Sequence, residues 1–487
     1  WKDKVSFLVS GRLSNLGWLT RLMSGDNKLR LYFYDINAKL KIKASRKDRI
    51  FLTYYMGKDE FIRDITSVYS SFGISWDNYA ATLRWSHIFN HKVFSNTTFN
   101  SGNYRYFLHL APKRRDYWRS AIMDFSFKED ITWYINPNNT FRAGGEFSRH
   151  YSDPGNLYYE DAASNAFVSK VPKYYSDELA LYLSNEQKIG NLDLSYGIRF
   201  PIWQNNGPTT VYYFNVNHNV IDTLNVSDDK YYARFFNPEP RLSASYSIGN
   251  HSTLKASYNR AVQYIQMLSN GTGPFTSLDV WVPAGPNIDP LISDQTTLGY
   301  FLKAFKGKLE FSAEAYYKHL SNHLDYTDHA NLLYNPLIEG EIRMGEAWSK
   351  GMEFLLQKTS GKFTGWLGYT YSRTTVKTPE VNGGRSYPAS YDSPHSFSLF
   401  LSYDTYKRWA FSANWIYRTG NPYTSPIGFY YYDGYTVPLY GEKNNERLPE
   451  YHRLDISVVL RLNRPEQRYK HSLALTIYNF YGRANPF

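Results

Sequence analysis

The chain contains no cysteine among its 487 residues. This absence excludes disulfides, thiolate metal sites and cysteine nucleophiles together. The first residues, Trp1 to Lys4, contain neither an initiating Met nor the apolar stretch of a signal peptide. We therefore expect a mature or truncated chain.

The sequence also lacks any run of about 18 apolar residues, the length that a membrane-spanning helix needs. A repeat of about 40–50 residues, the period of propeller blades, is not visible either. The alternative of a large soluble all-β protein therefore has little support. If the chain lies in lipid, a closed β-barrel is the remaining architecture, since an open sheet edge would leave backbone groups unsatisfied.

Aromatic residues make up 18% of the chain, and the formal net charge is +11. Tyr and Trp suit the interfacial girdles of a membrane barrel, where an apolar ring body meets lipid and a polar tip meets water. The Lys and Arg residues are spread over turns, loops and polar strand faces and form no single basic stripe, which argues against a nucleic-acid partner. Contact with anionic lipid head groups or anionic ligands explains the positive excess better.

Apolar and polar residues alternate one by one along most of the chain. The pattern is clear in residues 454–462 (LDISVVLRL), 192–200 (LDLSYGIRF) and 411–418 (FSANWIYR). Such strands present one apolar and one polar face. With no helical segment to cover a sheet, the pattern predicts an all-β antiparallel barrel with lipid outside and water inside.

The pattern predicts about nineteen strands, joined alternately by short Gly, Asn, Asp or Pro turns and by long loops. Short turns at one rim and long loops at the other are typical of outer-membrane barrels, with the long loops extracellular. The predicted strands are 5–12, 32–43, 49–57, 78–89, 93–110, 118–135, 140–151, 176–189, 191–203, 231–248, 252–266, 295–305, 308–326, 346–358, 362–377, 394–404, 408–418, 452–462 and 469–480. The predicted long loops are 13–30, 58–77, 152–175, 204–230, 267–294, 327–345, 378–393 and 419–450.

The first and last predicted strands both run outward, which requires an odd number of strands. Bacterial barrels normally have an even number. We therefore expect residues 1–487 to be one barrel domain that lacks at least one downward strand after Phe487.

Several motifs resemble the barrel of TonB-dependent outer-membrane transporters, especially those of the Bacteroidetes, and together they span nearly the whole chain. The motifs are residues 33–39 (FYDINAK) with the turn at 47–49, residues 240–246 (PRLSASY), 254–260 (LKASYNR), 361–366 (GKFTGW), 451–455 (YHRLD) and 478–483 (YNFYGR). The resemblance implies a 22-stranded barrel in which the visible strands are numbers 3 to 21. It also implies a plug domain that is absent from this chain.

Two loops are the candidate ligand-binding regions. The loop 264–294 holds Tyr264, Asp279 and Trp281 among several prolines and glycines, which suit a compact loop with stacking and hydrogen-bonding groups. The loop 419–450 holds seven aromatic residues, including Tyr430 and Tyr431, which would form an exposed patch unless a ligand, a lid or a partner covers them. Packing between loops, without any ligand, is the alternative for both.

Strand alternation places a second set of polar side chains inside the barrel, where we expect them to bond the missing plug and, second to that, a substrate. They are Arg199, Lys255, Asn259, Arg418, Asp455 and Arg461. His319, His323 and His329 cluster near one strand end, but His319 and His323 would share a face about 13 Å apart, too far to hold one ion. The sequence predicts no metal site, no cofactor and no enzymatic activity.

The resemblance implies active import of a scarce nutrient across the bacterial outer membrane, with energy from an inner-membrane coupling protein acting through the plug. Outer-membrane lipid, lipopolysaccharide and a surface lipoprotein are the further expected partners. The substrate stays open between a ferric chelate, cobalamin, an oligosaccharide and a peptide. A passive porin and a barrel that anchors a surface adhesin or an assembly complex are the alternatives, although nineteen strands exceed the 16–18 of porins.

Overall fold

The computed structural model describes residues 4–15, 17, 27–65, 70–109, 117–158, 171–228, 230–268, 280–327, 330–332, 335–463 and 468–486. Within these ranges, 21 β-strands join into one sheet, and four two-stranded sheets lie in the connections. No helix in these ranges is long and apolar enough to cross a bilayer. In the described part of the chain, and apart from single residues, the helical segments are the 3₁₀ turns η3 (Ile338–Glu341) and η4 (Val381–Gly384).

The strands of the large sheet pair antiparallel and follow one another in chain order, except that in two places two successive strands share one partner. Tyr231–Phe236 and Glu239–Ile248 both pair with Leu192–Asn206, and Tyr387–Pro388 and His395–Asp404 both pair with Phe363–Lys377. The strands of this sheet are β1 (Val5–Asn15), β2 (Asn27–Lys43), β3 (Asp48–Ile65), β4 (Ser70–Ile88), β5 (Val93–His109), β6 (Tyr117–Asn136), β7 (Asn139–Tyr158), β8 (Tyr174–Ile189), β9 (Leu192–Asn206), β12 (Tyr231–Phe236), β13 (Glu239–Ile248), β14 (Ser252–Gln263), β17 (Leu291–Ala304), β18 (Leu309–Tyr326), β19 (Ile342–Lys358), β20 (Phe363–Lys377), β21 (Tyr387–Pro388), β22 (His395–Asp404), β23 (Trp409–Arg418), β28 (Tyr451–Arg461) and β29 (Ser472–Ile477).

The outer face of the sheet carries a continuous apolar row. Cross-strand partners link Phe7, Leu40, Leu52, Leu83, Phe99, Phe127, Phe147 and Leu179 in turn from β1 to β8. Most of these side chains are exposed. On β4, β5 and β6 the residues next to them in sequence are polar and lie on the opposite face. Thr82 donates to Asn100 Oδ1 at 2.9 Å, and Asn100 Nδ2 donates to Ser126 Oγ at 3.1 Å. The register therefore gives one apolar face and one hydrogen-bonded polar face, as the alternation predicts.

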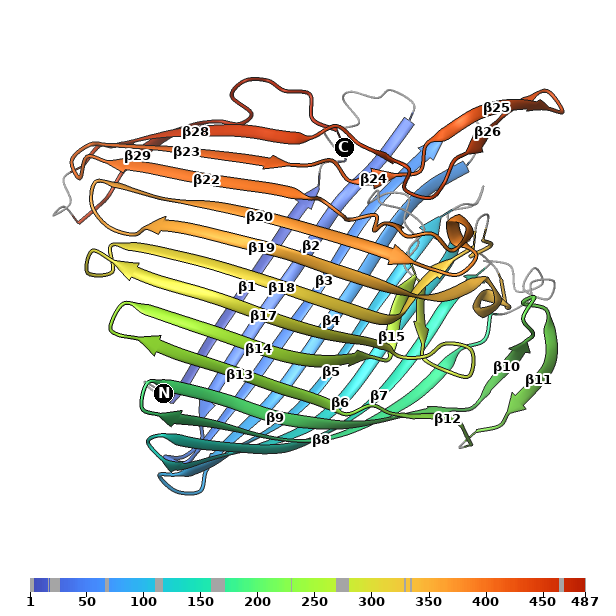
Figure 1. Cartoon of the computed structure of the whole chain (residues 1–487), viewed down its shortest axis with the longest axis horizontal. Helices are drawn as coiled ribbons and strands as arrows, with labels where there is room; N and C mark the ends of the chain where they lie inside the picture. The colour runs from blue at the N-terminus through green and yellow to red at the C-terminus, as the bar shows by residue number, and fades with distance from the viewer. Residues whose placement is uncertain are drawn as a thin grey trace.

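The sheet curls so that β1–β7 form one wall and β8–β28 the facing wall (Figure 1). Short turns such as those between β13 and β14 lie at one end, and the long connections lie at the other. Below, these are the turn end and the loop end, and the inner face is the polar face that the two walls share. Among the described residues, β1 pairs only with β2 and β29 only with β28.

Each of the nineteen predicted strands overlaps a strand of the large sheet, but two expectations about the connections are wrong. The predicted loop 58–77 is mostly strand, because β3 and β4 continue to Ile65 and from Ser70, with 66–69 outside the described residues. These extensions carry charges on the outer face, which hides the apolar alternation. Three other long connections, those after β9, β14 and β23, contain extra short strands: β10 (Thr209–Phe214), β11 (Val220–Val226), β15 (Ile265–Leu268), β16 (Val280–Pro283), β24 (Pro422–Tyr423), β25 (Pro426–Tyr432), β26 (Tyr435–Tyr440) and β27 (Glu446–Arg447).

An aromatic belt lies on the outer face near the loop end. Tyr369 stacks on His395, and Tyr417 stacks on His452, with ring centroids 6.2 and 6.4 Å apart. Phe397 bridges Tyr369 and Tyr417. Rings with one polar edge are the residues expected at a membrane interface.

Candidate functional site

The connection between β14 and β17 crosses the interior of the curled sheet. Its strands β15 and β16 pair with each other, and Leu268, Val280 and Val282 are almost completely buried. They pack in one apolar cluster with inner-face residues of the facing wall, among them Tyr106 and Trp118. Apolar burial therefore fixes the β15–β16 hairpin against the opposite side of the sheet.

A hydrogen bond adds direction to this apolar packing. Ser152 Oγ on β7 donates to the Trp281 carbonyl at 2.6 Å, and Ser152 itself is buried. The Trp118 ring can lie beside β7 because residue 155 is glycine: a Cβ there would lie 2.0 Å from the ring. The hairpin is thus docked on β6 and β7 by shape as well as by apolar area.

The remaining connections at the loop end are tied together by polar contacts. Arg343 Nε donates to Glu380 Oε2 at 2.7 Å, and the other oxygen of Glu380 pairs with His218 Nε2 at 3.1 Å. The Arg343 guanidinium lowers the pKa of Glu380, assisted by His218. Asn382 exchanges two hydrogen bonds with the backbone of Lys443. The β10–β11 hairpin, the η4 segment and the β23–β28 connection therefore form one linked rim.

A buried carboxyl group holds the η3 segment in this rim. Glu339 accepts hydrogen bonds from Tyr174 Oη at 2.7 Å and from Asn287 Nδ2 at 2.5 Å. Asn287 also donates to the Tyr212 carbonyl at 2.8 Å, so one contact set joins β8, β10 and the segment that precedes β17. Burial raises the pKa of Glu339, although the two hydrogen bonds oppose that shift.

A cavity of about 470 Å³ lies between these connections and the crossing hairpin. The lining includes four tyrosines, one histidine, one ion pair and the end of β15. The lining residues are Met267, Leu268, His323, Leu324, Asp325, Tyr326, Val376, Tyr387, Ala389, Ser390, Tyr391, Pro422, Tyr423, Thr424, Lys443 and Asn444. Its size and its mixture of rings with a few polar groups suit a small molecule. We call this cavity the loop-end pocket.

An ion-paired centre forms one wall of the loop-end pocket. Lys443 Nζ and the Tyr387 hydroxyl each donate to a different oxygen of Asp325. Thr378 Oγ1 lies 3.0 Å from the same Tyr387 oxygen, and Lys443 Nζ lies 4.2 Å from the Tyr326 ring centroid. Burial, together with the Asp325 carboxylate, raises the pKa of Tyr387 well above its ordinary value. The charges of Lys443 and Asp325 cancel, so this wall of the pocket combines one ion pair with tyrosine rings and has no net charge.

A β-bulge separates the histidines that the sequence placed on one face. Asn322 has a positive φ of 61°, and the register with β19 shifts between Ser321 and His323. His319 therefore stacks on Trp348, while His323 lines the loop-end pocket, with a buried Nδ1 that has no hydrogen-bond partner among the described atoms. The expectation that His319 and His323 share a face is wrong. His329 lies outside the described residues, and within them no three His, Cys, Asp or Glu residues form a metal-binding group.

The sequence-predicted ligand residues lie in different environments. Tyr264 is 4% exposed and stacks on Trp203, with ring centroids 5.1 Å apart, so its position suits packing. Trp281 is partly buried in the crossing hairpin, and Asp279 lies outside the described residues. Tyr430 and Tyr431 lie on the β25–β26 hairpin, which projects from the loop end, and they are 52% and 78% exposed. The four of these residues that the structure describes therefore do not form one site.

The predicted inner-face residues lie on strands of the large sheet, and most have contacts recorded. Arg199 bonds Glu178 at 2.5 Å and Glu239 at 3.2 Å, and Arg461 makes two bonds to Asp404 at 2.8 and 2.6 Å. The contacts of the others are the Phe301 ring for Lys255, Asn421 for Arg418 and Arg453 for Asp455; Asn259 lies opposite Arg241 in the register.

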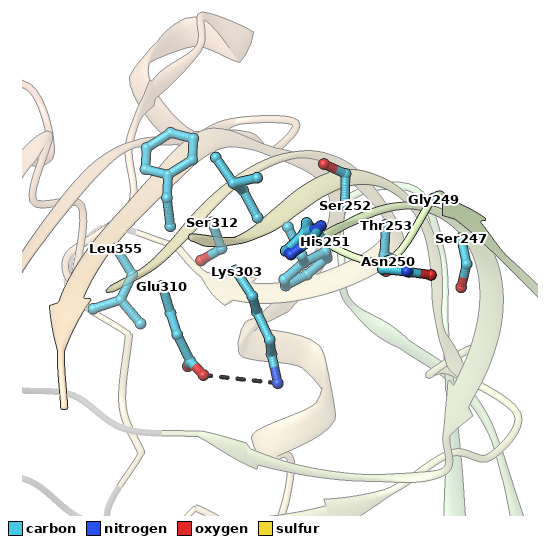
Figure 2. A pocket seen from close by; sticks show the side chains of 13 residues that line it. Ser247, Gly249, Asn250, His251, Ser252, Thr253, Lys303, Glu310, Ser312 and Leu355 are labelled. Carbon is cyan, nitrogen blue, oxygen red and sulfur yellow. Dashed lines mark ion pairs between the residues drawn. The ribbon is translucent and has the colours of Figure 1, made fainter. Parts of the chain in front are cut away.

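A second cavity, of about 490 Å³, lies at the turn end. Figure 2 shows Lys303 and Glu310 facing each other across it, with 3.7 Å between Nζ and Oε1. Phe301, Ser312 and Leu355 also line it. Because it lies at the opposite end of the sheet from the linked rim, it is not part of the loop-end pocket.

Sequence reasoning missed most of the loop-end pocket. Asp325 and Tyr326 close a strand, Tyr387 and Tyr391 follow η4, and Lys443 lies 118 positions from its partner Asp325. No local motif connects these segments. A weak signal existed only in the aromatic content of the connection that holds Tyr423.

Comparison with known proteins agrees with this fold. Residues 10–480 match the family model described as TonB dependent receptor-like, beta-barrel. Similar solved structures include the ferric-catecholate import receptor Fiu from Escherichia coli K12 (TM-score 0.64, 13% identity, 99% of this chain and 74% of that one). The FrpB iron transporter from Neisseria meningitidis (TM-score 0.66, 10% identity, 99% and 74%) and the copper transporter OprC (TM-score 0.65, 12% identity, 99% and 72%) are similar too. No curated protein matched in sequence.

Proposed function

Because this chain belongs to the TonB-dependent receptor β-barrel family of the bacterial outer membrane, we propose that it imports a scarce nutrient, taken as a metal chelate, by energy-coupled transport. The loop-end pocket carries the proposal, since it offers rings, hydroxyls and one ion pair in a cavity sized for a small molecule. The solved relatives include a ferric-catecholate import receptor and a copper transporter, which favours a chelate over the other open substrates. The function proposed is transport without catalysis.

We infer a two-step capture. The exposed Tyr430 and Tyr431 on the projecting hairpin would meet the ligand first by ring stacking. The ligand would then enter the loop-end pocket, where Tyr391 and Tyr423 offer stacking surfaces beside the Asp325–Lys443 pair. The crossing hairpin with Trp281 would separate this pocket from the inner-face residues further along the path.

The plug and the energy-coupling contact belong to the proposal as well. The ion pairs Arg199–Glu178 and Arg461–Asp404 line an inner face that a plug would contact, as the family resemblance implies. A Bacteroidetes type and a surface lipoprotein at the loop end remain part of the same hypothesis. The rival proposal, a passive porin, differs in needing no energy.

The test is uptake of radiolabelled iron as a ferric catecholate by cells that express the full receptor as their only one. We expect uptake that stops when the inner-membrane energy-coupling protein is deleted, and that falls in a Lys443→Met receptor. Lys303→Met is the matched control, because it removes a lysine from the turn-end cavity. Uptake that persists without the coupling protein would support a passive channel. An energised receptor that ignores every ferric and cupric chelate offered would exclude this substrate class.

A further inference from the structure

Basic residues collect in the short turns, which lie together at the turn end of the sheet (Figure 1). The turns that follow β2, β4, β17, β19, β22 and β28 each contain lysine or arginine with an exposed side chain. Together these residues are the turn-end cations: Arg46, Lys47, Lys92, Lys306, Lys308, Lys362, Lys407, Arg408, Arg468 and Lys470. Neighbouring turns lie two strands, or about 10 Å, apart, so the cations form a repeating series along this edge.

The positive charge is not compensated within these turns. Neither Asp nor Glu occurs in residues 44–47 (ASRK), 89–92 (FNHK), 305–308 (FKGK), 359–362 (TSGK) and 405–408 (TYKR). The carboxylates beside these turns already have partners, which are His87 for Asp48, Lys303 for Glu310 and Arg461 for Asp404. Within the described residues, no carboxylate pairs with a turn-end cation, so these turns keep their positive charge.

The cations are not spread evenly around the sheet. The turns that follow β6, β8 and β13 contain neither lysine nor arginine and read PN (137–138), GN (190–191) and GNH (249–251). The loop end has the opposite balance, because the connections after β9, β14 and β23 each hold more acidic than basic residues. Positive charge is therefore gathered at one end of the molecule and at particular turns of that end.

Two of the turn-end cations are held in place by uncharged oxygens. Lys47 Nζ donates to the Phe89 carbonyl at 3.2 Å, and Lys92 Nζ donates to the Ile135 carbonyl at 3.3 Å. Each ammonium thus bonds the backbone near the next turn, keeps its charge and has further N–H groups to donate. A side chain that is already ordered loses less conformational entropy when it binds an anion.

These observations describe the partner that would fit. The short turns of an outer-membrane barrel are periplasmic, so the partner is met in the periplasm. Lipid surrounds a membrane protein on every side, and its head groups would meet the neutral turns as often as the basic ones. A polymer with a repeated anionic group instead lies along one side and meets one basic turn after another.

We propose that the turn-end cations bind peptidoglycan, the anionic glycopeptide polymer of the periplasm, through the carboxylates of its peptide side chains. Lysine and arginine form charge-assisted hydrogen bonds with carboxylates. Each exposed contact is weak, and the repetition over several turns makes the sum appreciable. The receptor would thereby be tethered to the cell wall, whatever nutrient it transports.

The test is co-sedimentation of the purified full receptor, in a nonionic detergent, with isolated peptidoglycan sacculi. A second batch of sacculi has its carboxylates converted to amides. Native mass spectrometry of the same receptor samples measures retention of phosphatidylglycerol, the anionic lipid that offers the alternative explanation.

Three variants separate charge from position. The neutral variant removes three cations from adjacent turns and is Lys362→Gln/Lys407→Gln/Arg408→Gln. The charge-keeping variant is Lys362→Arg/Lys407→Arg/Arg408→Lys. The loop-end variant removes the same charge from exposed residues at the other end and is Arg63→Gln/Lys230→Gln/Lys377→Gln.

We expect the neutral variant to bind sacculi roughly tenfold more weakly than the wild type, because three charges leave the surface that faces the polymer. The charge-keeping and loop-end variants should bind as the wild type does. Amidated sacculi should retain little receptor, and added salt should weaken binding to the untreated ones.

Equal binding by the neutral and loop-end variants, or undiminished binding to amidated sacculi, would overturn the proposal. So would phosphatidylglycerol retention that falls in the neutral variant while its binding to sacculi does not, because the cations would then serve the lipid. Heat-modifiability on gels identifies a variant that fails to fold, and Lys306→Gln/Lys308→Gln then takes the place of the neutral variant.

Discussion

Ser152 and Trp281 lie 129 positions apart, yet Ser152 Oγ donates a hydrogen bond of 2.6 Å to the Trp281 carbonyl. The bond joins β7 to a hairpin that begins on the facing wall of the sheet. The bond holds the hairpin across the interior of the curled sheet, and no local sequence pattern predicts this contact. The position of the crossing hairpin therefore depends on a contact between two distant parts of the chain.

Replacing Ser152 by Ala removes the hydroxyl donor and adds no atom to the buried site. We expect the hairpin to lose about 1–3 kcal/mol of docking free energy, because a buried carbonyl is left without its partner. Hydrogen exchange at the backbone amides of residues 280–282 should become faster, while exchange in β20 stays unchanged. Unaltered protection of 280–282 would mean that apolar packing alone holds the hairpin.

Two adjacent residues of β28 test which face meets the lipid. Val458 lies between Phe411 and Leu475 in the register, both exposed, whereas the hydroxyl of Ser457 lies 2.9 Å from that of Thr476. Val458→Arg should destabilise the barrel by about 2–4 kcal/mol if it lies at mid-membrane, and Ser457→Arg much less. Heat-modifiability on gels compares the two, and equal effects would contradict the assignment of faces.

The Asp325–Lys443 pair should behave as one unit. Lys443→Gln leaves the buried Asp325 carboxylate without its cation, so we expect a loss of about 1–3 kcal/mol in the stability of the linked rim. Adding Asp325→Asn to the Lys443→Gln variant should restore part of this stability, because the unpaired carboxylate is then gone. We expect a coupling energy between the two positions of about 0.5–3 kcal/mol. Hydrogen exchange at residues 441–447 in the four proteins measures this coupling. Strictly additive losses would show that the pair is not coupled.

Glu339 should make the rim sensitive to pH. Its folded-state pKa is raised from 4.5 by burial, so the folded rim retains the proton to a higher pH than the unfolded chain does. The stabilisation that protonated Glu339 gives the folded rim is complete below about pH 4.5, and it is lost as pH rises through the pKa of Glu339 in the folded state. We expect residues 335–341 to exchange faster at pH 8 than at pH 5, after correction for intrinsic rates.

Glu339→Gln is the control for this pH dependence, because glutamine does not titrate. Its oxygen can still accept from Asn287 Nδ2, and its NH₂ group can donate to the Tyr174 oxygen in place of the bond that Glu339 accepts. The protection of residues 335–341 in this variant should be the same at both pH values. A pH dependence that persists in Glu339→Gln would assign the effect to another group.

The sequence by itself determined the strands, their inner and outer faces and the two kinds of connection. A strand shows its two faces every second residue, so Val458 and Ser457 could be assigned without coordinates. The resemblance to a family, carried by motifs spread over the whole chain, is confirmed by the match over residues 10–480. These are local properties, repeated many times, and each repeat strengthens the inference.

Only the tertiary structure decided where the loops lie and which side chains they bring together. Tyr264 was predicted to contact a ligand but lies in a buried stack with Trp203, and the bulge at Asn322 places His323 in the pocket, apart from His319. Asp325 lies at the end of β18, Tyr387 in β21 and Lys443 in the connection between β23 and β28. Their meeting depends on burial and on hydrogen bonds between segments far apart in sequence, and periodicity along one strand carries no information about such contacts.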